Sequence, residues 1–230
     1  MISENLIAVK NHIVEAARKS GRDPGRIRLV TVTKQVPEDN IREAQHAGAM
    51  LFGENKVQEA IKKIDALGAE KFRWHFIGHL QKNKVKNIFG LFELIHSVDS
   101  IALAELIHSG SLKLGRVTPI LLQVNISGES SKSGLAPERL EETLAAASKF
   151  KGVKVEGLMT IPPYNSDPEK SRKHFARLRE LRDSIENTGI ENISLHELYM
   201  GMSNDYMTAI EEGATLVRVG AAIFGPRAYL

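Results

Sequence analysis

The sequence has 230 residues and a formal net charge of only +3, with 42% hydrophobic and 26% charged residues. That length suits one large domain or two small ones, and the composition is ordinary for a globular protein. The weak charge imbalance argues against a dominant role in nucleic-acid binding. Because the chain contains no cysteine, it forms no disulfides, thiolate metal sites or cysteine nucleophile.

The sequence shows no targeting or membrane signal. The opening residues, Met1 to Asn5, lack the basic and then apolar pattern of a signal peptide. No apolar stretch approaches the ~20 residues that span a bilayer. We therefore expect a cytoplasmic protein without a membrane segment.

Short apolar runs alternate with helical patterns along the chain. An opening helix is expected first, and two later helices begin with a proline in the first turn. The expected helices cover residues 4–20, 38–47, 55–67, 137–150 and 168–187. The expected strands cover residues 28–33, 50–53, 73–78, 94–98, 117–125, 155–161, 194–201 and 216–220.

About eight strands separated by helices, with no low-complexity linker, predict a single-domain (β/α)8 TIM barrel over residues 1–230. Only ten residues follow Gly220, too few for a full helix after the last strand. The opening helix is expected to fill that place, since the first and last strands are neighbours in a closed barrel. An open, doubly wound sheet is the alternative, but no GxGxxG loop follows the first strand.

Two charged residues stand where buried strands are predicted. Arg218 interrupts the apolar run 215–220, and a guanidinium inside such a strand needs a fixed, electron-rich partner. Lys34 ends the first strand, where an amine is a candidate for Schiff base formation. Each residue alone is also compatible with a solvated strand end or a structural ion pair, but barrel closure brings the two onto adjacent strands.

Barrels of this kind often hold a phosphate between the loops after strands seven and eight. Ser203 follows the seventh strand, where its hydroxyl either caps the next helix or binds a phosphate. After the eighth strand, the small residues Gly220 and Ala221 let the backbone approach an anion closely, although a tight turn would use them equally well. Both loops are therefore suited to a phosphate.

Pyridoxal 5′-phosphate combines a phosphate, an aldehyde for a lysine and a ring nitrogen for an arginine. Lys34 would form the Schiff base and Arg218 would donate to the pyridine nitrogen. Because arginine stays protonated, the ring nitrogen stays unprotonated and the ring is a weaker electron sink. Such a site favours holding the cofactor over catalysis.

The motifs that carry these residues resemble the pyridoxal phosphate homeostasis protein family, also described as alanine-racemase N-terminal-domain-like. The matching segments are 30–34 (VTVTK), 52–59 (FGENKVQE), 74–84 (WHFIGHLQKNK), 124–127 (VNIS), 132–134 (KSG), 157–161 (GLMTI), 200–205 (MGMSND) and 217–220 (VRVG). The resemblance covers the chain from about residue 28 to its end. It implies a barrel similar to the N-terminal domain of alanine racemase, with the cofactor on Lys34 and no additional β domain.

The resemblance also implies roles for residues around the cofactor. Asn55 would lie beside it, and Met200 would belong to the apolar wall of the pocket, where an ordinary core position is equally compatible. Tyr199 departs from the family, which usually has a small residue there. Lys132 is either a mobile amine near the mouth, able to hold a second cofactor molecule, or a surface residue.

The function implied is that of a monomeric, non-enzymatic protein that binds and protects pyridoxal phosphate and supplies it to apo-enzymes. A racemase-like enzyme is the alternative, but no tyrosine lies in a motif resembling its second base. A Schiff-base aldolase would not require Arg218. No metal site is expected, because His75 and His79 are four residues apart but on a predicted strand and turn, where the helical i,i+4 geometry of a ligand pair does not apply. The basic run 82–86 fits a solvated helix face better than a nucleic-acid or acidic partner.

Overall fold

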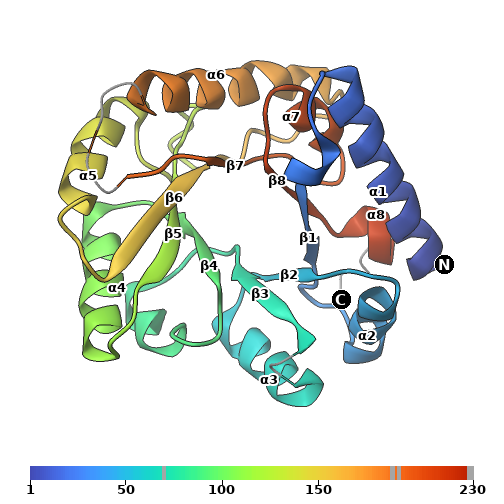
Figure 1. Cartoon of the computed structure of the whole chain (residues 1–230), viewed down its shortest axis with the longest axis horizontal. Helices are drawn as coiled ribbons and strands as arrows, with labels where there is room; N and C mark the ends of the chain where they lie inside the picture. Colours follow the sequence, from blue (N-terminus) through green and yellow to red (C-terminus); the bar gives the residue numbers. More distant parts are fainter. Residues whose placement is uncertain (69–70, 187–189, 191–192, 227–230) are drawn as a thin grey trace.

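The structure is a computed structural model that describes residues 1–68, 71–186, 190 and 193–226. In this part of the chain, eight parallel strands form a closed barrel in sequence order, with the helices outside it (Figure 1). The strands are β1 (Arg28–Val32), β2 (Leu51–Glu54), β3 (Arg73–Phe76), β4 (Leu94–Val98), β5 (Thr118–Gln123), β6 (Val153–Met159), β7 (Glu197–Tyr199) and β8 (Leu216–Val219). The helices are α1 (Ile2–Lys19), η1 (Pro24–Arg26), α2 (Glu38–His46), α3 (Val57–Leu67), η3 (Lys82–Asn87), α4 (Ile101–Lys113), η4 (Pro137–Arg139), α5 (Leu140–Ala147), α6 (Glu169–Glu186), α7 (Tyr206–Glu211) and α8 (Ala221–Phe224).

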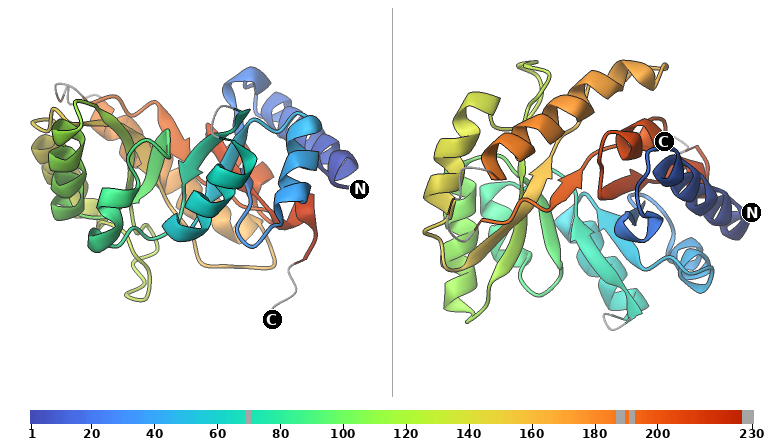
Figure 2. Two further views of the ribbon diagram at one scale, coloured as in Figure 1. Left: turned by 90° about the horizontal axis from the view of Figure 1, so that it is seen from below. Right: turned by 45° about the horizontal axis from the view of Figure 1, so that its top comes forward.

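The predicted (β/α)8 barrel is confirmed, including its closure. β1 pairs with β2 on one side and with β8 on the other. Val30 lies opposite Arg218 and Thr31 opposite Val219. Since the strands are parallel, the loop that begins with Lys34 and the loop that follows β8 leave the barrel side by side at its carboxyl-terminal end. Figure 2 shows the loops after β5 and β6 projecting on the same side as α8.

The opening helix takes the place expected for it. α1 packs against α7 and α8, as Figure 1 shows. It buries Leu6, Val9 and Ile13, which share one helical face. Asn5 Nδ2 donates to the carbonyl of Ile223 at 2.9 Å. The first and last helices of the barrel are thus joined by apolar packing and by one long-range hydrogen bond.

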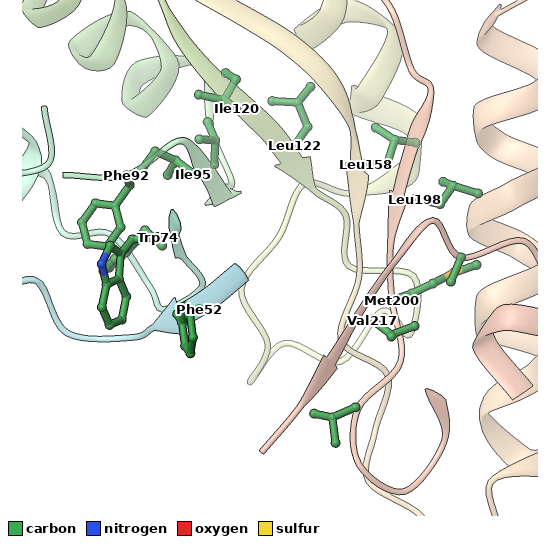
Figure 3. Packing of buried hydrophobic residues seen from close by; sticks show 14 of the residues in the cluster. Phe52, Trp74, Phe92, Ile95, Ile120, Leu122, Leu158, Leu198, Met200 and Val217 are labelled. Atoms are coloured by element: carbon green, nitrogen blue, oxygen red, sulfur yellow. The ribbon is translucent and has the colours of Figure 1, made fainter. Parts of the chain in front are cut away.

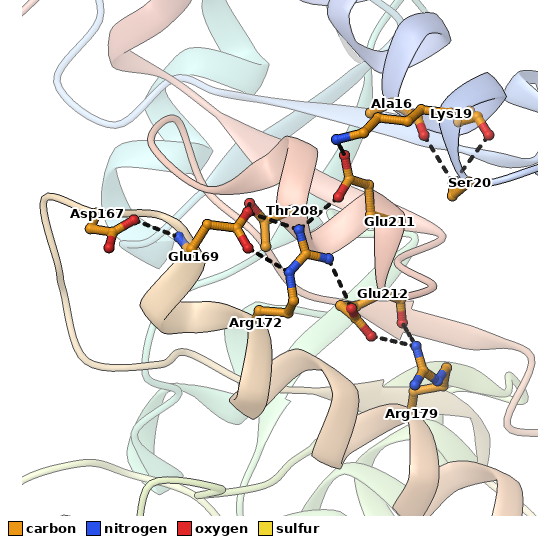
Figure 4. A network of polar contacts seen from close by, with 11 residues as sticks. Ala16, Lys19, Ser20, Asp167, Glu169, Arg172, Arg179, Thr208, Glu211 and Glu212 are labelled. Atoms are coloured by element: carbon orange, nitrogen blue, oxygen red, sulfur yellow. Dashed lines mark hydrogen bonds and ion pairs between the residues drawn. The ribbon is translucent and has the colours of Figure 1, made fainter.

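Ion pairs tie three helices on this side of the barrel (Figure 4). Arg172 of α6 contacts Glu169 at 2.7 Å, Glu211 at 2.7 Å and Glu212 at 2.9 Å. Lys19 of α1 reaches Glu211 of α7 at 2.7 Å. Hydrogen bonds from Lys19 and Arg172 lower the pKa of Glu211 below its ordinary value, so this carboxylate stays charged well into the acidic range.

Several elements are shorter than predicted, for local backbone reasons. The strand expected over 194–201 is reduced to β7, and Gly201 beyond it takes a φ of +89° that no extended strand contains. The helix expected from Asn55 starts at Val57, because Lys56 is extended with a φ of −129°. The predicted end of the helix over 168–187 lies outside the described residues. None of the helices in the described ranges combines the length and hydrophobicity that a bilayer crossing requires.

Buried apolar side chains form two clusters on opposite faces of the strands. The inner cluster is made of strand residues alone and fills the barrel: Val30, Leu51, Leu94, Leu121, Met159, Tyr199 and Leu216. The outer cluster lies between strands and helices and includes most of the core (Figure 3). Leu121 belongs to the inner cluster while Ile120 and Leu122 belong to the outer one, as strand alternation requires. The barrel interior is therefore a small and separate compartment.

Candidate functional site

The amino-terminal end of the barrel is held by a charged pair. Arg28 Nη2 lies 2.7 Å from Glu197 Oε1, and Thr215 Oγ1 donates to Glu197 Oε2 at 2.6 Å. These contacts join β1, β7 and the segment before β8. Catalytic and binding sites of such barrels lie at the opposite end, where the strands finish.

Two histidines meet inside the barrel, on neighbouring strands. His96 Nε2 and His75 Nδ1 are 2.9 Å apart, so one ring donates a hydrogen bond to the other. Burial, together with the positive charges of Arg28 and Arg73, lowers the pKa of His75 to about 3. Burial and the nearby His75 and Arg218 also lower the pKa of His96 well below its ordinary value. Both imidazoles are therefore neutral at physiological pH.

Tyr199 and Arg218 complete this group, which we call the barrel cluster (His75, His96, Tyr199 and Arg218). The rings of Tyr199 and His96 meet edge to face with centroids 3.9 Å apart, and the Arg218 guanidinium lies 4.6 Å from the Tyr199 centroid. Arg218 Nη2 is 3.5 Å from the carbonyl of Thr160, at the limit of a hydrogen bond. The electron-rich partner expected for Arg218 is thus in part the tyrosine ring, a cation–π contact.

Polar atoms of the barrel cluster remain unpaired. His96 Nδ1, the Tyr199 hydroxyl and Arg218 Nε are buried and have no hydrogen-bond partner among the described residues. Unpaired buried polar atoms are costly, and several together at one place indicate that something further binds there. Burial raises the pKa of Tyr199, against the lowering effect of Arg218, so its hydroxyl stays protonated.

Lys34 follows β1 in a turn and is half-buried. The next residue, Gln35, has a φ of +59° and donates its backbone N–H to Glu59 Oε1 at 2.7 Å. Asn55 follows β2, and its buried Oδ1 has no hydrogen-bond partner among the described residues. A Cβ on Gly78 would lie 2.1 Å from the carbonyl oxygen of Asn55, so only glycine fits beside it. Lys34 and Asn55 thus lie at the same barrel end, on neighbouring strands.

The loops after β7 and β8 meet directly. Gly220 N donates to Ser203 Oγ at 3.2 Å. Ser203 does not cap the next helix: α7 has its cap position at Asp205, whose carboxylate accepts from Met202 N at 2.8 Å. Ala221 follows Gly220, opens α8 and is exposed to solvent. A hydroxyl and the backbone of a helix start therefore face the same small volume.

Met200 is not brought to this group. Its side chain is fully buried in the outer cluster, near Leu198 and Val217 (Figure 3). Alternation explains this, because Tyr199 beside it belongs to the inner cluster. The structure thus favours the core position that the sequence left open for Met200.

Other residues singled out in the sequence lie nearby or on the surface. Lys132, in the loop after β5, is half-buried and its Nζ lies 3.4 Å from the carbonyl of Pro162. His79 is 3.6 Å from Asp99 Oδ2, and no group of three metal-ligating side chains occurs in the described parts of the chain. Lys82 and Lys86 are exposed on η3.

Sequence reasoning missed the barrel cluster and a buried ion cluster next to Lys34. The ion cluster consists of Glu54, Glu59 and Lys63. Its signal in the sequence is the position of Lys63, which falls on the buried face of α3 with Ala60 and Ile64. A lysine on an apolar helix face needs a buried partner.

Known proteins resemble this chain over its whole length. A family model described as alanine racemase, N-terminal domain, matches residues 5–228. A pyridoxal phosphate homeostasis protein of Aquifex aeolicus is 45% identical over 226 residues, covering 98% of this chain and 98% of that protein.

Solved structures give the same picture. PipY of Synechococcus elongatus PCC7942, determined with PLP bound, is 36% identical with a TM-score of 0.87, covering 98% of this chain and 100% of that one. An alanine racemase of Clostridium difficile 630 is 15% identical with a TM-score of 0.73, covering 97% of this chain and 56% of that one. The likeness to the racemase is one of fold alone.

Proposed function

We propose, on the premise that the chain belongs to the pyridoxal phosphate homeostasis protein family, that it binds pyridoxal 5′-phosphate at the carboxyl-terminal end of its barrel. The observation that carries this proposal is the contact between Ser203 and Gly220, beside the strand-end Lys34. It would give one barrel end both an anion site and an amine. The PLP-bound structure of PipY, similar over the full chain, supports the same ligand.

The residues present fit the chemistry of this cofactor. The Ser203 hydroxyl and the backbone N–H groups of Gly220 and Ala221 would hold the phosphate, with the Gly220 N–H exchanging its present acceptor, Ser203 Oγ, for the anion. Arg218 Nε is a buried donor without a partner among the described residues, which suits an acceptor such as the pyridine nitrogen. Asn55 Oδ1 is a buried acceptor in the same situation.

Lys34 would bind the cofactor covalently. Its Nζ joins the aldehyde carbon, and the carbonyl oxygen leaves as water, so the bond is reversible by hydrolysis or by a competing amine. When bound, the cofactor supplies an electron-withdrawing ring. Arg218 would donate to the ring nitrogen and, because it stays protonated, would limit that capacity. The chain's own residues therefore hold the cofactor and do not activate it.

None of the tyrosines in the described ranges is placed to act as a second base, which favours a carrier over a racemase. Tyr199 keeps its hydroxyl deep in the barrel, and Tyr164 is 79% exposed. Tyr206 shares a hydrogen bond of 3.0 Å with His12. The fourth tyrosine, Tyr229, lies outside the described residues. We therefore propose a monomeric, cytoplasmic protein that protects pyridoxal phosphate and delivers it to apo-enzymes, without catalytic turnover and without nucleic-acid partners.

Borohydride reduction tests the covalent assignment. Reduction of the loaded protein should fix the cofactor's mass on the peptide that contains Lys34, and Lys34→Ala should abolish the label. Lys132→Ala is the matched control and should keep the label, because Lys132 is the other amine near the barrel mouth. A wild-type label fixed on a different lysine would reject the assignment.

Turnover is tested by incubating the loaded protein with a panel of amino acids in deuterated water. We expect little exchange at Cα, no selective racemisation, and transfer of the cofactor to an added apo-enzyme. Racemisation of one amino acid at the ~1 to 10³ per second of ordinary enzymes would favour the racemase.

A further inference from the structure

A buried ammonium lies behind Lys34, on the outer side of the barrel wall. Lys63 of α3 is 4% exposed, and its Nζ donates to the carbonyl of Thr33 at 2.6 Å. The same Nζ lies 2.8 Å from Glu54 Oε1 and 2.8 Å from Glu59 Oε1. An ammonium has three donors, and each of them has a partner here.

The two carboxylates extend these contacts to both sides of Lys34. Glu54 Oε1 also accepts from Thr33 Oγ1 at 2.6 Å, so the residue before Lys34 is held through its carbonyl and its hydroxyl. Glu59 Oε1 accepts from the backbone N–H of Gln35 at 2.7 Å, so the residue after Lys34 is held as well. One ion cluster thus forms hydrogen bonds with the residues on either side of Lys34.

The second of these contacts acts on a strained residue. Gln35 is the one non-glycine residue with a positive φ among those the structure describes. That conformation is unfavourable for a residue with a Cβ and persists only where the surroundings enforce it. Glu59 supplies the enforcing contact, because it accepts the N–H of Gln35 while Lys63 holds the carboxylate in place.

We propose that Glu54, Glu59 and Lys63 are positioning residues for Lys34, which fix the peptide groups around it and so aim its amine at the aldehyde carbon of pyridoxal phosphate. This inference rests on the proposed function. None of the three needs to touch the cofactor. Since a reacting group held in place reacts faster than a mobile one, the cluster sets the rate at which the cofactor is attached and released.

The lead experiment compares covalent attachment with non-covalent binding in Glu59→Ala. Attachment is followed as the rate of absorbance change after mixing with pyridoxal phosphate. Non-covalent binding is measured with pyridoxine 5′-phosphate, which has the ring and phosphate but no aldehyde. We expect attachment to slow about tenfold, as loss of a charge-assisted hydrogen bond implies, while affinity for pyridoxine 5′-phosphate stays within about twofold of wild type. Gln58→Ala, exposed on the same helix, is the matched control and should attach at the wild-type rate.

Three further variants separate an effect on geometry from general damage to the fold. Gln35→Gly in the Glu59→Ala background should recover part of the rate, because glycine adopts a positive φ without strain. Glu59→Gln keeps an oxygen acceptor for the N–H of Gln35 and should stay close to the wild-type rate. Lys63→Met should slow attachment as Glu59→Ala does, and Glu59→Ala alone decides the matter if Lys63→Met does not fold.

The outcomes distinguish the two proposals. If wild type attaches the cofactor at Lys34 but Glu59→Ala does so at the same rate, the positioning role is wrong and the proposed function stands. The inference would also be overturned if Glu59→Ala lost affinity for pyridoxine 5′-phosphate by the same factor as its attachment rate, and if Gln35→Gly did not restore that rate. Such a result would reflect damage to the whole pocket. Failure of wild type to attach the cofactor at Lys34 would instead reject the proposed function.

Discussion

The ion cluster and the barrel cluster are both buried and polar, but they differ in whether their hydrogen-bond donors have partners. In the ion cluster, the three donors of Lys63 are all used, by Thr33, Glu54 and Glu59. In the barrel cluster, the Tyr199 hydroxyl and Arg218 Nε are buried without a partner in the described part of the chain. The donors of the ion cluster are thus all paired, although its acceptor Glu54 Oε2 is not, whereas the barrel cluster leaves donors without a partner.

We infer from this difference that the two faces of the barrel wall have different roles, one in holding the backbone and one in binding a ligand. A cluster with every donor satisfied is rigid and holds neighbouring backbone in one geometry. A cluster with unpaired donors is costly in the free protein and gains free energy when a ligand supplies acceptors. We therefore expect changes in the ion cluster to act mainly on stability and on the position of Lys34. Changes facing the barrel mouth should act mainly on cofactor affinity.

Removing Lys63 should have the largest effect on stability. Lys63→Met leaves Glu54 fully buried without its cationic partner, and breaking a buried ion pair from one side costs about 3–5 kcal/mol. Urea unfolding of the cofactor-free protein, followed by circular dichroism, measures this loss. Lys62→Met on the exposed face of α3 should change stability by less than about 0.5 kcal/mol. Equal stability of the two variants would contradict the view that the ion cluster stabilises the fold and fixes the backbone around Lys34.

Lowering the pH should reduce the free energy of unfolding, because the two histidines of the barrel cluster are held neutral in the folded state. The pKa of His75 is lowered to about 3 and that of His96 lies well below its ordinary value, whereas both protonate near pH 6.5 in the unfolded chain. The unfolded state therefore binds more protons below pH 6.5, so stability is full above that pH and falls as the pH drops. Between pH 6.5 and 5 the loss should be about 1.6 kcal/mol for His75, and His96 adds to it in the same direction.

Urea unfolding at a series of pH values checks this expectation. His75→Asn should be less stable at pH 7 but should lose less between pH 6.5 and 5 than wild type does. The ion pairs of Glu211 respond only at lower pH, because their lowered carboxylate pKa keeps them intact there. An unchanged pH slope in His75→Asn would show that this histidine is not held neutral.

Cofactor affinity should be most sensitive to substitutions in the loops that follow β7 and β8. Ser203→Ala removes one hydroxyl from the proposed phosphate site, and a hydrogen bond to a charged group is worth roughly 1.5–3 kcal/mol. Affinity for pyridoxal phosphate should fall about tenfold or more, while the stability of the free protein falls by about 1 kcal/mol, because the N–H of Gly220 loses its acceptor. Equilibrium dialysis measures the affinity. Equal binding of pyridoxal and its phosphate by wild type would remove the phosphate site from the proposal.

The smallest effect is expected at Tyr199. Tyr199→Phe keeps the ring against Arg218 and removes a hydroxyl that has no partner among the described residues. The free protein should therefore be unchanged or more stable, by up to about 1 kcal/mol. A loss of more than that in urea unfolding would mean that the hydroxyl has a partner after all, and that the barrel cluster is better satisfied than we describe.

The strand–helix order was predictable from the sequence because each strand is an apolar run bounded by turn residues. The predicted end of the strand 194–201 was wrong, because Gly201 has a positive φ that an extended strand does not contain. The φ of a glycine cannot be predicted from the sequence alone. The start of α3 was wrong because Lys56 is extended.

The site was predictable where it depends on topology alone. Lys34, Ser203 and Gly220 follow parallel strands, and such strands must end at the same side of a barrel. Contacts inside the barrel depend instead on the layer each side chain occupies, and the register shifts between β4 and β5 and between β5 and β6. The meeting of His75 with His96 depends on the register between β3 and β4, and that of Tyr199 with Arg218 on the register between β7 and β8; the spacing of residues along the chain does not determine either register. Met200 and Tyr199 are both apolar enough to face inward, so the sequence alone could not tell which of them does.

The pairing of β1 with β8 determines when the site exists during protein synthesis. The ribosome delivers β1 early, but the partners of Val30 and Thr31 in the last strand are Arg218 and Val219. Until β8 emerges, β1 keeps an open edge and Lys34 has neither Arg218 nor Gly220 beside it. Parallel pairing between distant segments is also slow to form. The proposed cofactor site therefore forms only after β8 has been made, and the capture of pyridoxal phosphate would report that the barrel has closed.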